Sequence, residues 1–203
     1  MTDLTQLQRG LLNLMKGRPI EAHADYYLQR VAVSNELLLA KEIALWWRAF
    51  GLETYCIFTS RLLNRLGIFD QAVETFFCEC STSPFIEKLS QDFLAWMSMH
   101  KDPLVASVAR FERALIKVKR GDSGIYRLDW SCNPESLLNA ILQGTGFPPA
   151  EIHQIYRTTI SSRIPGLVSC ERVERTKASE SSSRVGRAPS NTVSCMDSRH
   201  VKD

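Results

Sequence analysis

Apolar side chains recur every three or four positions through most of residues 1–120, the spacing of one face of an α-helix. Leu4, Leu7 and Leu11 begin this pattern, and Gly17 with Pro19 ends the first element. Further helical elements are expected over residues 55–66 and 68–80, so the first 120 residues indicate a helical bundle.

A wide apolar face marks the run of residues 35–50. Ser34 precedes this run as a good N-cap, and Gly51 is expected to end it. The face suits the centre of a bundle and consists of Leu38, Leu39, Ile43, Trp46, Trp47 and Phe50. We therefore expect these tryptophans to be packing residues.

Two later helices are predicted by a capping residue followed by proline, which favours the first helical position. Ser83 stands before Pro84, and Asp102 stands before Pro103. Apolar stripes follow both starts, and Gly121 closes the second helix. The stripes consist of Ile86, Leu89, Phe93, Trp96 and Met97, and of Leu104, Val108, Phe111, Leu115 and Val118.

Alternation replaces helical spacing after residue 121. Strands are predicted at 125–130, 153–163 and 167–173, with a helix at 134–142 after the first. The fold class is therefore α+β: an N-terminal helical bundle (1–120), then a small three-stranded antiparallel sheet with an inserted helix (121–173). Residues 174–203 are rich in serine and basic residues and are expected to be a disordered tail. A sheet this small is expected to have a free edge.

The charge of the chain argues against a nucleic-acid-binding surface. The net charge is +3, and residues 174–203 contain six Lys or Arg against four acids. The tail thus carries +2, which leaves +1 on residues 1–173. The first residues lack a secretory signal, and no apolar run approaches the roughly 20 residues of a membrane span. We expect a cytoplasmic protein whose six cysteines are free thiols.

No convincing catalytic or metal site emerges from the sequence. The histidines, none of them in a known nucleophile motif, are His23, His100, His153 and His200. Cys78 and Cys80 with His100 form the one faint metal cluster, but zinc sites prefer wider cysteine spacing and a second pair. The cations near residues 117–120 are interpreted as a helix end that complements the helix dipole.

Several segments carry a family resemblance. They are residues 102–106 (Asp-Pro-Leu-Val-Ala), 111–115 (Phe-Glu-Arg-Ala-Leu), 126–130 (Tyr-Arg-Leu-Asp-Trp), 134 with 137–138, and 156 through 163–166. Over residues 84–173, and more loosely before them, the chain resembles the MbnC-like accessory proteins of methanobactin biosynthesis. These are encoded beside multinuclear non-haem iron oxidases that modify ribosomally made peptides. The wider set includes proteins labelled "putative DNA-binding domain".

The resemblance implies a division of labour between two subunits. The partner oxidase would hold the iron atoms and use dioxygen to oxidise peptide cysteines to oxazolone and thioamide groups. The accessory subunit would form a heterodimer with it and bind the leader of the precursor peptide. This chain would then need no cofactor of its own, and neither nucleic acid nor membrane is an expected partner.

A mechanism for leader binding follows as a hypothesis. An extended leader would add to the edge of the small sheet, and strands 125–130 and 154–161 are the candidates. Apolar pockets would be lined by Tyr126, Leu128, Trp130, Ile155 and Tyr156, while Arg127, Arg157 and Arg163 would pair with acidic groups. Ile125 and Asp129 complete the first candidate strand. The competing interpretation is that these aromatic residues merely cover the helical bundle.

Two other functions stay open at this stage. One is a helical DNA-binding regulator, favoured by the mildly basic charge and the family label. The other is a cysteine-dependent enzyme, for which Cys78 or Cys132 would be the reactive thiol.

Overall fold

Helices and a small sheet share one chain in the computed structural model, which describes residues 3–19, 25–151 and 154–174. The helices in these residues are α1 (Leu4–Met15), α2 (Tyr26–Ala32), α3 (Asn35–Tyr55), α4 (Ile57–Arg65), α5 (Phe69–Glu79), α6 (Ile86–Met97), α7 (Pro103–Lys119) and α8 (Pro134–Gln143). The strands are β1 (Tyr126–Trp130), β2 (Gln154–Ile160) and β3 (Val168–Glu174). The predicted α+β class and the three antiparallel strands are confirmed. The predicted tail lies outside the described residues.

Local capping chemistry explains where several helices begin. Asp102 Oδ1 accepts a hydrogen bond from the Leu104 N–H at 2.8 Å, as the Asp-Pro start of α7 predicts. Ser34 Oγ accepts from the Leu37 N–H at the start of α3. The predicted start of α6 at Pro84 is wrong, because the Ser83 hydroxyl caps a turn at Phe85 and the helix begins later. The predicted end of α3 is also wrong, since the helix continues through Gly51.

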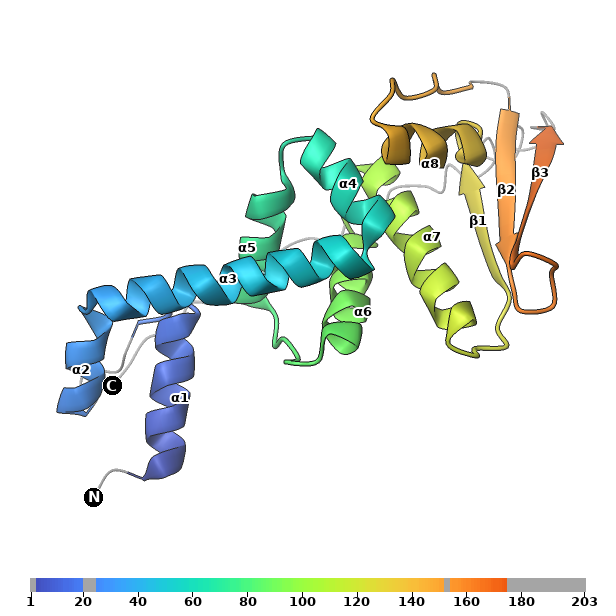
Figure 1. Ribbon diagram of the computed structural model, residues 1–203. Helices are drawn as coiled ribbons and strands as arrows, with labels where there is room; N and C mark the ends of the chain where they lie inside the picture. The colour runs from blue at the N-terminus through green and yellow to red at the C-terminus, as the bar shows by residue number, and fades with distance from the viewer. Residues whose placement is uncertain (1–2, 20–24, 152–153, 175–203) are drawn as a thin grey trace, which may run out of the picture.

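One large hydrophobic core joins the helices to the sheet. It contains residues from the second half of α3, from α4 to α8, and from the strands, among them Phe93, Val108, Trp130 and Ile160. Helix α7 packs against α6 on one side and against β1 and β2 on the other. The sheet is therefore held in place by α7 (Figure 1).

The N-terminal arm consists of α1, α2 and the first turns of α3, and it has a core of its own. Its buried side chains are Leu14, Leu28 and Leu37. The long helix α3 runs from this arm to the main core (Figure 1). The end of α1 is tied to α5 because Lys16 Nζ donates a hydrogen bond to the Cys80 carbonyl at 2.7 Å.

The sheet has the order β1-β2-β3, with both pairs antiparallel. β2 is therefore the central strand, and β1 and β3 are the edges. None of the helices in the described residues is long and apolar enough to cross a membrane.

Candidate functional site

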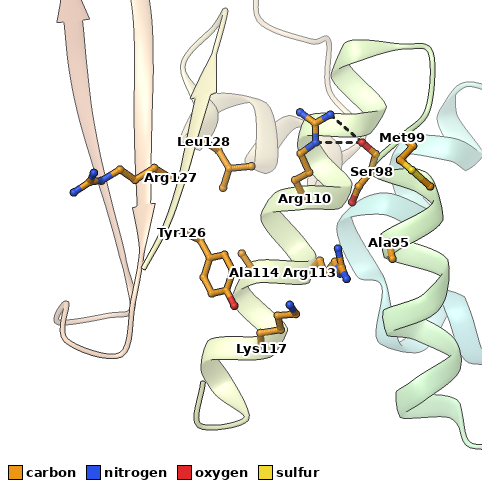
Figure 2. A pocket seen from close by; sticks show the side chains of 10 residues that line it. All are labelled: Ala95, Ser98, Met99, Arg110, Arg113, Ala114, Lys117, Tyr126, Arg127 and Leu128. Carbon is orange, nitrogen blue, oxygen red and sulfur yellow. Dashed lines mark hydrogen bonds between the residues drawn. The ribbon is translucent and has the colours of Figure 1, made fainter. Parts of the chain in front are cut away.

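The side chains of β1 alternate between two environments. Tyr126 and Leu128 are half-buried and point toward α7, whereas Arg127 lies exposed on the opposite face (Figure 2). Trp130, which also follows the inward alternation, is buried with its ring 5.8 Å from that of Phe111 in an edge-on contact. Trp130 is thus a packing residue, and the expectation that it lines an accessible pocket is wrong.

The aromatic hydroxyls of the sheet are held by nearby carboxylates. The Tyr126 hydroxyl donates to Asp122 Oδ2 at 2.7 Å, which raises the pKa of Tyr126 and lowers that of Asp122. The Tyr156 hydroxyl donates to Glu151 Oε1 at 2.8 Å, which raises the pKa of Tyr156. Both rings are therefore fixed in orientation, and the Tyr126 ring also lies 5.7 Å from Lys117 Nζ.

The expectation of a free edge on β2 is wrong, because β2 pairs with β1 on one side and β3 on the other. Its residues Ile155, Tyr156 and Arg157 have no open backbone to offer a peptide. Arg157 is already bonded to Asp129 through two hydrogen bonds. Arg163 is exposed in the turn between β2 and β3, and Ile125 is exposed just before β1.

A groove of about 590 Å³ lies at the edge of β1 that faces away from β2, between β1, α6 and α7 (Figure 2). Its lining includes four cations: Arg127 belongs to β1, and Arg110, Arg113 and Lys117 occupy one side of α7 at helical spacing. The described residues around the groove include no Asp or Glu and are Ala95, Ser98, Met99, Arg110, Arg113, Ala114, Lys117, Tyr126, Arg127 and Leu128. The groove therefore combines positive charge with apolar walls.

The groove cations differ in the hydrogen bonds that they make within the protein. The Arg110 guanidinium donates to the Ser98 carbonyl at 3.1 and 2.9 Å, which holds it at the end of α6. Arg113 Nε is shielded from solvent and has no hydrogen-bond partner. Sequence reasoning missed these residues because Arg110 and Arg113 sit in a regular helix, and Lys117 resembled an ordinary helix-end cation.

The second candidate surface is the apolar face of α3, formed by Leu38, Leu39, Ile43, Trp46, Trp47 and Phe50. Trp46 and Trp47 are 59% and 60% exposed, and Phe50 is 51% exposed. The rings of Trp46 and Phe50 stack with centroids 5.7 Å apart, and Trp47 meets Trp46 edge-on at 5.0 Å. The expectation that these residues form the centre of a bundle is wrong.

The physical reason is that α3 packs through its other side. Leu45, Ala49 and Leu52 face the main core, and Gly51 lies so close to Ile86 that an added Cβ would be 2.3 Å from Ile86 Cδ1. The Arg48 guanidinium covers the Phe77 ring at 4.2 Å. Helix α3 therefore packs on the main core through Leu45, Ala49 and Leu52, and its bulky aromatic residues stay at the surface.

The thiols and histidines of the described residues do not gather into a site. No group of three or more His, Cys, Asp and Glu side chains is placed to hold a metal in this part of the chain. Cys132 is buried, and burial, assisted by Glu151, raises the pKa of its thiol. His100 Nδ1 accepts a hydrogen bond from the Asp102 N–H, which is a structural contact. His23, His153 and His200 lie outside the described residues.

Comparison of the chain with protein-family models, with curated proteins and with solved structures gives no match.

Proposed function

We propose that this chain is an accessory subunit that binds a multinuclear non-haem iron oxidase and presents to it the leader of a ribosomally made precursor peptide. In this proposal the chain does no redox chemistry, and the iron belongs to the partner. The product class is that of methanobactin-type biosynthesis, in which peptide cysteines become oxazolone and thioamide groups.

The observation that carries the proposal is the exposed apolar face of α3. Large aromatic residues clustered on a surface are typical of protein interfaces, because they bury much area with little loss of side-chain entropy. Three of the six side chains of this face are aromatic and in mutual contact. The exposed acids Glu36, Glu42 and Glu53 lie on the same helix. A partner that covers the face should therefore present apolar residues with basic ones around them.

The open edge of β1 supports the peptide-binding half of the proposal. An added strand would continue the sheet in the order β3-β2-β1-peptide, and main-chain hydrogen bonds would supply its affinity. The groove supports this placement, because three of its lining residues, Tyr126, Arg127 and Leu128, belong to β1 (Figure 2).

The proposal is tested by producing the chain together with an oxidase of this class, taken from a methanobactin-type gene cluster, and following complex formation by size-exclusion chromatography. The two proteins should elute together. Trp46→Ser combined with Phe50→Ser should weaken the complex by at least about tenfold, as expected when interface aromatic residues are lost. Leu66→Ser is the matched control, because Leu66 is also exposed and apolar but lies at the end of α4.

Two results would overturn this assignment. One is a purified chain that oxidises a peptide without any partner. The other is elution of the wild-type chain apart from every oxidase of the class, with the oxidase folded and loaded with iron.

A further inference from the structure

We infer that the groove beside β1 binds an extended peptide segment that carries carboxylates at alternate positions, read by Arg110, Arg113 and Lys117. This inference rests on the peptide-binding half of the proposed function and specifies its ligand. The peptide carboxylates would be bound by cations of α7 and not, as the sequence suggested, by Arg157 and Arg163.

The position of the groove selects an extended ligand. A strand added to β1 would lie about 4.8 Å from it, which is the usual spacing between paired strands. That strand would lie over the side of α7 that carries Arg110, Arg113 and Lys117 (Figure 2). Every second side chain of such a strand would point down toward α7. Ala95 and Ala114, which also line the groove, leave room for these side chains.

The spacing of the cations matches that of the ligand. Alternate residues of a strand are about 6.8 Å apart, and residues four apart on a helix are separated by about 6 Å along its axis. Arg113 and Lys117 stand in that relation on α7. Two carboxylates at alternate positions would therefore each meet one cation.

The charge of the groove selects an acidic ligand. No carboxylate is among its described lining residues, and Arg113 Nε is a shielded donor without a partner. A carboxylate in the groove would accept from that guanidinium, and charge-assisted bonds of this kind are roughly twice as strong as neutral ones. The apolar part of the lining, with Met99 at 78% exposure on its rim, would contact the methylene groups of the same side chains.

Two rival occupants fit less well. The chain's own residues 174–203 carry a net charge of +2, so they have the same sign as the groove. A nucleic acid would place phosphates on the cations. Its bases could stack on only one aromatic ring among the described lining residues, that of Tyr126. The peptide is favoured because β1 offers it backbone hydrogen bonds as well.

The test uses the full chain and a fluorescein-labelled decapeptide of alternating Glu and Thr, with fluorescence anisotropy as the readout. A decapeptide of alternating Gln and Thr is the neutral control. The Glu peptide should bind at least about tenfold more tightly than the Gln peptide, and salt should weaken its binding. Equal affinity of the two peptides would overturn the inference.

Matched variants locate the site. Arg113→Gln with Lys117→Gln should weaken binding of the Glu peptide by about tenfold or more, and a melting curve will check that the variant is folded. Lys119→Gln with Arg120→Gln also removes two cations, both exposed at the end of α7 and outside the groove lining, and should change affinity by less than about twofold. An equal loss for both variants would show that net charge, and not the groove, attracts the peptide, and the inference would fail.

Backbone methylation tests the strand geometry. N-methylation of either all Glu or all Thr residues removes the amide donors on one edge of the peptide. One of the two methylated peptides should lose binding and the other should keep it. Retention of affinity by both would exclude strand addition.

A single-stranded decanucleotide tests the nucleic-acid alternative in the same assay. Tighter binding of this decanucleotide than of the Glu peptide would assign the groove to phosphate and overturn the inference. None of these outcomes depends on the oxidase, so they are separable from the chromatography above.

Discussion

Asp129 and Arg157 lie directly opposite each other on β1 and β2 and form a two-pronged ion pair. Arg157 Nε is 2.8 Å from Asp129 Oδ1, and the second nitrogen is 3.1 Å from Oδ2. Both residues are on the face of the sheet away from α7. The guanidinium that the sequence suggested for a peptide carboxylate is therefore already bound to one within the sheet.

This pair should make a small, pH-dependent contribution to stability. The hydrogen bond from Arg157 lowers the pKa of Asp129, so the contribution is complete above the ordinary aspartate pKa of about 3.9 and is lost as the pH falls through the lowered value. In a double-mutant cycle with Asp129→Asn and Arg157→Gln, the two effects should be less than additive near pH 7 and additive at pH 2. Urea denaturation measures this, and additivity at both pH values would contradict it.

Glu112 stabilises the start of α4 from a distant helix. Its Oε1 and Oε2 accept hydrogen bonds from the N–H groups of Phe58 and Thr59 at 2.9 and 2.8 Å, and it is only 4% exposed. The side chain of Cys56, the N-cap residue of α4, makes no capping hydrogen bond. Glu112→Ala should therefore lower the free energy of unfolding by about 2–4 kcal/mol, because a buried and a part-buried N–H group lose their acceptor. Chemical denaturation provides the measurement.

The Glu112 carboxylate should also make the free energy of unfolding depend on pH, with a sign opposite to that of Asp129. Burial raises the pKa of Glu112, although the hydrogen bonds from Thr59 and Phe58 act against the rise. The folded chain then holds this proton more tightly than the unfolded chain does. The free energy of unfolding should decrease as the pH rises from about 4.3 through the raised pKa. Glu112→Gln should remove this part of the slope, and an unchanged slope would refute the assignment.

Tryptophan fluorescence should report the exposed face of α3. Trp46 and Trp47 are open to solvent, whereas Trp130 is buried. Replacing both Trp46 and Trp47 by Phe should remove most of the emission that acrylamide quenches, with a change in stability within about 0.5 kcal/mol. Trp130→Phe should instead leave the quenched emission intact and lower the urea midpoint. Poor quenching of the wild type at low protein concentration would mean that the face is covered.

The N-terminal arm should open separately from the main core. Leu28 is one of its three buried side chains, and a Leu→Ala change in a core costs about 2–5 kcal/mol. Leu28→Ala should therefore abolish amide protection in α1 and α2 while α6 and α7 keep theirs, as measured by hydrogen exchange with mass spectrometry. Leu94→Ala, in the main core, is the control and should weaken protection throughout α6 and α7.

Local signals in the sequence predicted the parts of the fold that depend on neighbouring residues. The Asp102-Pro103 start of α7 and its end before Gly121 follow from capping chemistry that acts within a few residues. The three strands followed from the alternation of apolar and polar residues after residue 121.

The errors arose where tertiary contacts decide. Periodicity showed that α3 has an apolar face, but it does not say whether another element covers that face. Trp46 and Trp47 stayed outside because α3 packs on the main core through Leu45, Ala49 and Leu52. Alternation likewise does not reveal which strand is central, so β2 was wrongly considered as an edge. The α7 cations are identified as groove residues only by the position of β1 beside them.

Helix α3 joins two bodies of very different size, since Leu37 near its start packs with α1 and α2 while Leu52 near its end belongs to the main core. A partner subunit bound to the aromatic residues between these points would restrain the whole helix. It would thereby reduce the motion of the N-terminal arm without contacting that arm. Part of the association free energy would be spent on that ordering. Substitutions in α1 or α2 that favour the docked arm would then tighten the complex from a distance, by reducing the entropy lost on binding.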